Sequence, residues 1–229
     1  KISQTTPKAL LSISGKPLIF HIIWKLKKLG FKNIVINIHH HAELIKNYLN
    51  TLKLPELNLQ LSDETQLLLD TGGGLYKARH FFENADNILL HNVDIISTIN
   101  LNQLWNEHIQ SANIATLAVR QRETQRYLLF NDDGYLKGRI NLKTKKEEIF
   151  SNEQLNPYAF SGIHVINKSI FSKMHKQSVY SITDLYLELA KDNKIGKFVH
   201  NNDYWIDVGK PENIIEAEKI ANIMIESHN

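Results

Sequence analysis

The chain has 229 residues, of which 42% are hydrophobic, so it can bury a substantial core and does not belong to the disordered class. Lysine and arginine total 27 and aspartate and glutamate total 24, which leaves a formal charge of only +3. That balance argues against a nucleic-acid partner, and the small basic cluster Lys25, Lys27 and Lys28 is expected to be a solvated helix face. The chain has no cysteine, which excludes disulfides, zinc–thiolate sites and cysteine nucleophiles and fits a reducing cytoplasm.

Two further features concern the ends and the partners of the chain. No apolar run approaches the roughly 18 residues of a membrane span, and no signal peptide is visible, so no membrane association is expected. The sequence starts at Lys1 without Met, and its first residues read like the middle of a longer sequence. We therefore expect an upstream segment to be missing.

The first half of the chain alternates between helix and strand patterns. The periodicity predicts helices over 17–29, 42–52, 75–82 and 101–109, and strands over 33–38, 57–61, 87–91 and 112–119. This order predicts an α/β fold: a Rossmann-like, mostly parallel mixed sheet with helices on both faces. Such a sheet binds its ligand beyond the carboxyl ends of its strands.

After residue 119 the pattern changes to a smaller antiparallel elaboration. The predicted elements are a hairpin over 127–141 around the turn 132–134, a strand over 158–166, a helix from the cap Ser181 to about 190, strands over 195–200 and 204–208, and a closing helix opened by Pro211. No linker, repeat or low-complexity tract appears. Residues 1–229 are therefore predicted to form a single domain.

Two aspartates, Asp94 and Asp207, each end a short apolar strand pattern. A carboxylate at that position is held rigidly at the mouth of a sheet. A hard dication such as Mg²⁺ takes oxygen ligands, usually only one or two from protein, with phosphates and water completing its shell. The two aspartates could meet across one cleft and share a metal. The alternative is that each only caps the turn or helix that follows it.

Gly72, Gly73 and Gly74 are entropically costly unless the backbone approaches a partner closely or takes a positive φ. A helix is predicted to follow them, so its free N–H groups could meet an anion or the polar edge of a base. The alternative is a plain turn, since neither the P-loop nor the dinucleotide spacing is present. Lys8 follows Pro7, which stiffens the backbone before it and suits a phosphate contact. The alternative for Lys8 is an ordinary solvated surface lysine.

Four segments occur in an order that resembles one enzyme family. They are Thr6-Pro-Lys-Ala-Leu-Leu-x-Ile-x-Gly-Lys-Pro-Leu18, Thr71-Gly-Gly-Gly74, Asn92-Val-Asp94 and Trp205-Ile-Asp-Val-Gly-Lys-Pro-Glu212. This order resembles the sugar-1-phosphate nucleotidyltransferases over nearly the whole chain. The resemblance is closest to the branch with a Thr-Gly-Gly-Gly segment, which includes N-acetylmuramate-1-phosphate uridylyltransferases and the guanylyltransferases for mannose and heptose phosphates. It implies the nucleotide-diphospho-sugar transferase fold, with the antiparallel elaboration on the sugar side.

The resemblance also implies a reaction and a set of site residues. A sugar-1-phosphate oxygen attacks the α-phosphorus of a nucleoside triphosphate, and pyrophosphate leaves; we expect the product to serve cell-envelope glycans. Such a transfer needs positioning and charge neutralisation rather than a covalent nucleophile. The implied roles are Mg²⁺ held by Asp94 and Asp207, a phosphate contact from Lys8, a nucleotide-binding surface at Gly72, Gly73, Gly74 and Asn92, and a sugar contact at Ser161 and Gly162.

Two departures from the family pattern keep other functions open. The family has Gly-Asp after the strand where this chain has Val93-Asp94, and a valine is tolerable there if the backbone needs no positive φ. The family also opens with a strand and a Gly-x-Gly-x-Arg loop that wraps the triphosphate, and nothing of that kind precedes Lys1. The alternatives are a cytidylyltransferase for a non-sugar phosphate such as phosphocholine, or a regulatory module that binds nucleotide sugars without catalysis. The base, the sugar and the oligomeric state are left open.

Overall fold

The computed structural model describes residues 6–176, 179–209 and 211–226. The chain divides into two compact units. Unit 1 comprises Lys1–Leu68, Asn92–Ile99 and Asp203–Asn229, and unit 2 comprises Leu69–His91 and Asn100–Asn202. Within the described residues, none of the helices combines the length and the apolar character needed to cross a membrane. The single domain expected from the sequence stays a prediction.

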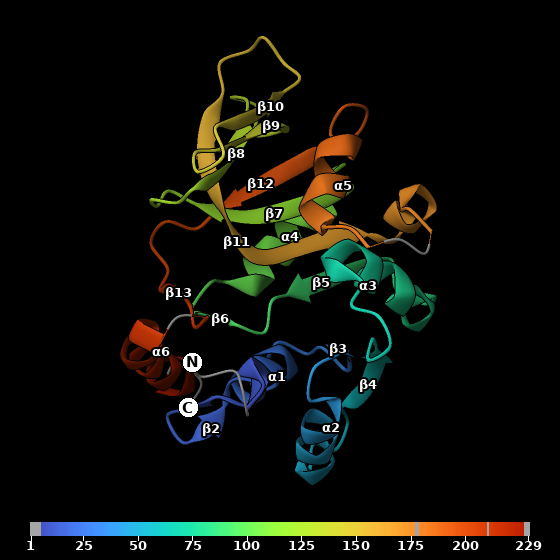
Figure 1. The fold of residues 1–229 in the computed structure, drawn as a ribbon, viewed down its shortest axis with the longest axis vertical. Helices are drawn as coiled ribbons and strands as arrows, with labels where there is room; N and C mark the ends of the chain where they lie inside the picture. Colours follow the sequence, from blue (N-terminus) through green and yellow to red (C-terminus); the bar gives the residue numbers. More distant parts are fainter. Residues whose placement is uncertain (1–5, 177–178, 210, 227–229) are drawn as a thin grey trace. The chain divides into compact units, whose positions relative to one another are not determined.

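Unit 1 is assembled from three separate stretches of the chain (Figure 1). Its elements are η1 (Lys8–Leu10), β1 (Ser12–Ile13), β2 (Lys16–Pro17), α1 (Leu18–Lys28), β3 (Asn33–Ile38), α2 (Ala42–Thr51), β4 (Asn58–Asp63), β6 (Ile95–Ser97), β13 (Trp205–Asp207), η4 (Pro211–Asn213) and α6 (Ile214–Glu226).

A β-α-β unit forms one half of unit 1. β3 and β4 pair in parallel, from Asn33 opposite Asn58 to Ile38 opposite Asp63. Because parallel neighbours cannot be joined by a tight turn, the connection carries α2. Ile38 is buried together with Ile45 of α2 in one apolar cluster. The predicted helix and strand boundaries are confirmed here to within a few residues.

A two-stranded antiparallel ribbon forms the other half of unit 1. β6 pairs with β13, with Ile95 opposite Asp207 and Ser97 opposite Trp205. The ribbon is fixed by its apolar side chains, because Ile96 is buried in a cluster with Val208 and with Ala217 and Ile220 of α6. The sequence predicted a strand at 204–208 but not its partner β6, which has only three residues.

The basic cluster on α1 is not a uniformly solvated face, so that expectation is wrong for one of its members. Lys28 is exposed and Lys27 is half-buried, and both ammonium groups lie over the ring of Trp24. Lys25 is only 8% exposed. A helix turns 100° per residue, so Lys25 falls on the apolar side of α1 with Ile22 and Leu26.

Unit 2 contains the larger sheet (Figure 1). Its elements are α3 (Asp70–Ala78), η2 (Arg79–Phe82), β5 (Asn87–His91), α4 (Leu101–Gln110), β7 (Ala115–Arg120), β8 (Arg126–Phe130), β9 (Leu136–Asn141), β10 (Lys146–Ile149), β11 (Asn156–Asn167), η3 (Lys168–Lys173), α5 (Ile182–Leu189) and β12 (Ile195–Val199).

The seven-stranded sheet of unit 2 is mixed, as the sequence predicts. β7 and β12 pair in parallel, whereas β11 pairs antiparallel with both β5 and β7. β5, β7 and β12 therefore point the same way, and β11 is inserted between β5 and β7 in the opposite direction. The predicted α/β class is confirmed, and one long reversed strand explains why fewer neighbours are parallel than a simple β-α-β order suggests.

The antiparallel elaboration extends from the first half of β11. β8 pairs with β11 and β9, and β9 pairs with β10, which forms a sheet edge with all four residues exposed. Its Lys146, Glu147 and Glu148 place charge on that edge, which discourages pairing with another chain. The helix α5 begins where predicted, with the hydroxyl of Ser181 accepting a hydrogen bond from the backbone N–H of Thr183.

Candidate functional site

Lys8 and Asp94 form an ion pair in unit 1. Pro7 leads into η1, and the backbone N–H of Leu10 donates to the carbonyl of Pro7, which fixes the start of this short helix. From there Lys8 Nζ reaches Asp94 Oδ2 at 3.3 Å, with the two side chains 48% and 27% exposed. An ion pair this exposed contributes at most about 1 kcal/mol. Lys8 is therefore paired with a carboxylate and does not face water alone. The pair is weak enough for Lys8 to exchange it for another contact.

The β6–β13 ribbon brings Asp94 and Asp207 side by side. Asp94 directly precedes β6, and its carbonyl accepts a hydrogen bond of 2.8 Å from the backbone N–H of Val208. Asp207 ends β13 opposite Ile95. Its Oδ1 accepts from the backbone N–H of Gly209 at 2.7 Å, which forms a turn of the kind expected of a capping aspartate. That bond engages one carboxylate oxygen, and the other oxygen, Oδ2, can take a second role.

Gly209 lies in close contact with the charged groups. A methyl group built on its Cα would lie 2.8 Å from Asp207 Oδ1 and 3.2 Å from Lys8 Nζ. The absence of a Cβ therefore lets the carboxylate and the ammonium lie closer to this backbone than another residue would permit. Lys210, the next residue of the same motif, lies outside the described residues. Gly209 was not among the site residues predicted from the sequence. Its place two residues after Asp207 could have indicated that it belongs to this cluster.

The donor set of this cluster, formed by Lys8, Asp94 and Asp207, suits Mg²⁺. It offers two carboxylates beside a backbone position, Gly209, that carries no Cβ. Among the described residues, no group of three or more His, Cys, Asp or Glu side chains is arranged to hold a metal by itself. Zinc and calcium favour such fuller protein shells, whereas Mg²⁺ is commonly held by one or two carboxylates with substrate phosphates and water. The residues present therefore fit the metal that the resemblance implies.

Asn92 and Val93 precede the cluster in the turn between β5 and β6. The carbonyl of Asn92 accepts a hydrogen bond from the backbone N–H of Ile95 at 3.2 Å, and the residue is exposed. Val93 does not take a positive φ and packs against the apolar cluster of unit 1. The valine is therefore accommodated by burial of its side chain. The nucleotide-binding role of Asn92 stays a prediction.

The predicted glycine segment lies inside a helix of unit 2, so the expectation that the helix starts after it is wrong. α3 begins at Asp70 and contains Gly72, Gly73 and Gly74, all of them buried. The backbone N–H groups of Gly72 and Gly73 donate to the carbonyl of Tyr180, at 2.9 and 3.4 Å. The sequence predicted that these two N–H groups would be free to meet a ligand, and that prediction is wrong. A Cβ on Gly72 would collide with the Tyr180 ring, so close packing explains the glycine.

The same segment is tied to the start of α5 by a side chain. Thr71 Oγ1 accepts a hydrogen bond of 2.9 Å from the backbone N–H of Ile182. The carbonyl of Leu69 accepts another from the N–H of Tyr180. The Thr-Gly-Gly-Gly motif therefore joins α3 to α5 within unit 2. Its contact with a nucleotide stays a prediction.

Ser161 and Gly162 lie in β11, also in unit 2. Ser161 is fully buried, and its hydroxyl lies 2.7 Å from Nε2 of the buried His200. Gly162 has a φ of +73°, and the register of β11 against β7 shifts between Phe160 and His164. A glycine is needed at this bulge because other residues rarely adopt that φ. The sugar-binding role of both residues stays a prediction.

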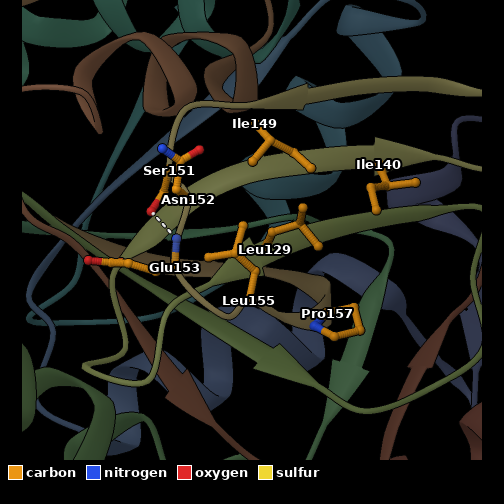
Figure 2. A pocket seen from close by; sticks show the side chains of 8 residues that line it. All are labelled: Leu129, Ile140, Ile149, Ser151, Asn152, Glu153, Leu155 and Pro157. Carbon is orange, nitrogen blue, oxygen red and sulfur yellow. Dashed lines mark hydrogen bonds between the residues drawn. The ribbon is translucent and has the colours of Figure 1, made fainter.

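A hollow in unit 2 has a different chemistry. It has a volume of about 450 Å³ and is lined by Leu129, Ile140, Ile149, Leu155, Pro157 and the segment Ser151–Glu153 (Figure 2). In this segment the backbone N–H of Glu153 donates to Ser151 Oγ at 3.2 Å. The lining is mostly apolar and includes none of the predicted site residues. It lacks the basic groups that a phosphate requires.

Comparison with known proteins gives the chain its family. The sequence model of the protein family described as nucleotidyl transferase matches residues 1–222. A probable mannose-1-phosphate guanylyltransferase 1 of Oryza sativa subsp. japonica is 24% identical over 96% of this chain, which spans only 60% of that relative's length. An N-acetylmuramate alpha-1-phosphate uridylyltransferase of Caulobacter vibrioides is 25% identical over 95% of this chain and 89% of its own.

A solved structure supports the same fold. The UDP-glucose pyrophosphorylase from Acinetobacter baumanii superposes with a TM-score of 0.76 at 12% identity, covering 98% of this chain and 93% of its own. At that identity the likeness concerns the fold alone, and it agrees with the nucleotide-diphospho-sugar transferase fold expected from the four sequence segments. Because the family model extends over nearly the entire sequence, the chain belongs to the nucleotidyl transferase family.

Proposed function

We propose that this protein joins a nucleoside triphosphate to a sugar 1-phosphate. In this reaction an oxygen of the sugar 1-phosphate forms a bond to the α-phosphorus of the triphosphate. The bond between that phosphorus and the bridging oxygen to the β-phosphate breaks. The products are a nucleoside-diphosphate sugar and pyrophosphate, which carries away the electron pair of the broken bond.

The observation that carries the proposal is the cluster in unit 1. A lysine ammonium and two carboxylates from three distant parts of the sequence converge there: Lys8, Asp94 and Asp207. Phosphoryl-type transfer needs charge neutralisation and alignment more than it needs a nucleophilic side chain. The exposed, weakly held ammonium of Lys8 can exchange Asp94 for a phosphate oxygen at little cost.

In this proposal Asp94 and Asp207 hold Mg²⁺. The ion would supply positive charge to neutralise the phosphate oxygens during transfer. Gly209 holds Asp207 Oδ1 through its backbone N–H and, lacking a Cβ, lets that carboxylate and Lys8 Nζ lie close to the backbone. The chain's own residues thus orient the carboxylates and supply one fixed positive charge.

The identity of the base and the sugar is best approached through the relatives. Their names specify guanylyl transfer to mannose 1-phosphate in the rice protein and uridylyl transfer to N-acetylmuramate 1-phosphate in the Caulobacter protein. GTP and UTP are therefore the first triphosphates to test, each with hexose, heptose and N-acetylated sugar 1-phosphates.

The test is a panel that measures pyrophosphate release. Each of the four ribonucleoside triphosphates and dTTP is combined with each sugar 1-phosphate in the presence of Mg²⁺. One pair is expected to release pyrophosphate in proportion to the nucleotide sugar found by chromatography. Controls without the sugar phosphate or with a chelator are expected to be silent. No release from any pair by the folded protein would overturn the proposal.

The same panel separates the other two functions. A cytidylyltransferase for a non-sugar phosphate would release pyrophosphate only from CTP with an acceptor such as phosphocholine. A regulatory module would bind a nucleotide sugar in calorimetry without releasing pyrophosphate. The names of the two relatives, both of which specify a sugar 1-phosphate, favour the sugar-1-phosphate enzyme over both.

A further inference from the structure

The ammonium group of Lys25 is buried in unit 1, where it bonds two backbone oxygens. Its Nζ donates to the carbonyls of Ser97 and Ile99, both at 2.9 Å. These carbonyls are two residues apart, so in an extended chain they lie on the same side. Burying a lysine is costly unless its N–H groups are bonded. The two bonds offset part of that cost and fix the carbonyls of Ser97 and Ile99 relative to α1.

The segment that Lys25 holds is the one that carries a site carboxylate. Ser97 ends β6, whose first residue directly follows Asp94. On the opposite edge β6 pairs with β13, and Thr98 continues that pairing because its N–H donates to the carbonyl of Tyr204 at 2.9 Å. β6 is therefore held on one edge by the strand that ends at Asp207 and on the other edge by Lys25.

We propose that Lys25 is a positioning residue for the Asp94–Asp207 pair, fixing the β6–β13 ribbon against α1 so that the two carboxylates keep the spacing that one divalent cation requires. Mg²⁺ accepts little deviation from its preferred geometry, so a small shift of β6 weakens a site built from two carboxylates. The inference rests on the proposed function for the role of the cation. The anchoring of β6 by Lys25 does not depend on the cation.

The chemistry of Lys25 agrees with this role at neutral pH. Burial lowers the pKa of its amine to about 8, and the nearby carboxylate of Asp203 opposes that shift. Below that value the amine stays protonated and keeps all three N–H donors. An apolar side chain of similar length would fill the space but would leave the two carbonyls without this donor.

The test compares Lys25→Met with the wild-type protein in two measurements. The first is amide hydrogen exchange. The variant is expected to exchange at least about tenfold faster at residues 95–99 and 205–208, with β3 and β4 unchanged. A lysine with a merely structural role would speed exchange throughout unit 1. The second is Mn²⁺ binding followed by electron paramagnetic resonance, in which affinity is expected to fall about tenfold.

Two further variants make the outcome decisive. Lys25→Arg keeps a cation with several donors and is expected to restore at least half of the local protection. Lys46→Met removes a half-buried lysine that pairs with Glu43 and Asp63 in the same unit, and both readouts are expected to stay within twofold of wild type. If Lys25→Met does not fold, Lys25→Gln takes its place under the same criteria. Ribbon protection and Mn²⁺ affinity that match wild type in a folded variant would overturn the inference.

The two proposals fail in different ways. If the wild-type protein binds no Mn²⁺ and releases no pyrophosphate, the proposed function fails while hydrogen exchange still tests the anchoring of β6. If Mn²⁺ binding and turnover are normal in Lys25→Met, the positioning role fails and the proposed function stands.

Discussion

Lys8 Nζ lies 3.3 Å from Asp94 Oδ2, so the ammonium occupies the neighbourhood in which the proposed cation would sit. Two positive charges cannot share one carboxylate cheaply. Binding of the cation is therefore expected to require that Lys8 turn away, and the phosphates of the substrate give it a new partner. The Lys8 ammonium is therefore expected to occupy the Asp94 carboxylate until the nucleotide binds.

Replacing Lys8 should affect metal and nucleotide binding in opposite directions. Lys8→Met removes a competing positive charge, and an exposed pair worth up to about 1 kcal/mol corresponds to about a fivefold gain in Mn²⁺ affinity without nucleotide. Turnover should fall at least about 100-fold because the phosphate loses its fixed charge. Electron paramagnetic resonance and pyrophosphate release measure the two effects. Lys46→Met, which breaks a similar pair with Asp63, serves as the control, and weaker Mn²⁺ binding in Lys8→Met would contradict the exchange.

The two carboxylates are expected to be essential and largely irrelevant to stability. Asp94→Asn and Asp207→Asn should each lower pyrophosphate release at least about 100-fold. Because both groups are partly exposed, the free energy of unfolding should change by no more than about 1 kcal/mol in urea titrations. Asp63→Asn is a matched control, since Asp63 also ends a strand of unit 1 and pairs with a lysine. Full turnover in either test variant would remove that aspartate from the site.

Gly209 provides a steric test of the same cluster. In Gly209→Ala the new methyl group would lie 2.8 Å from Asp207 Oδ1, so the carboxylate must move. Turnover should drop about tenfold, because displacements of an ångström are costly in a preorganised site. Gly15→Ala is the control: with a φ of +76° and open space around it, it should cost about 1 kcal/mol of stability and leave turnover unchanged. Equal turnover in both variants would show that the space at Gly209 is unimportant.

Gly72 is expected to matter for stability of unit 2. In Gly72→Ala the methyl group would collide with the Tyr180 ring and lie 2.9 Å from its carbonyl oxygen. Overpacking of this kind costs about 1–3 kcal/mol, measurable as a lower midpoint of urea unfolding. Tyr180→Ala in the same chain should recover part of that loss, because it removes the ring but not the carbonyl. If the effects of the two substitutions on the free energy of unfolding were additive, the new methyl group and the Tyr180 ring would not be in contact.

Acid should destabilise the protein through His164. Burial, reinforced by the charge of His91, lowers the pKa of His164 to about 3. The unfolded chain takes up this proton near pH 6.5, so the free energy of unfolding should fall by up to about 1.4 kcal/mol per pH unit below that value. His164→Phe, which keeps the ring contacts with Phe160 and Tyr186, should flatten the decline. Urea titrations from pH 7 to pH 4 make the comparison, and an unchanged slope would count against it.

Local patterns predicted much of this fold because they report what each segment buries. The strands β3 and β5 occupy the predicted residues, since their apolar runs end at polar side chains. Lys8, Asp94 and Asp207 could be singled out because each follows a strand pattern or a proline. Long-range partners could not be read in this way. The glycines of α3 depend on Tyr180, and the burial of Lys25 depends on two carbonyls far along the chain.

The discontinuity of unit 1 has a consequence for the protein during its synthesis. Asp94 leaves the ribosome before unit 2 is complete, but its neighbour Asp207 and the strand that pairs with β6 come from the last of the three stretches of unit 1. All of unit 2 emerges before them and is free to fold first, since domains fold as units from the N-terminal side. The paired carboxylates are therefore assembled only after all of unit 2 has been synthesised, and until then the nascent chain should be unable to capture a cation at this site.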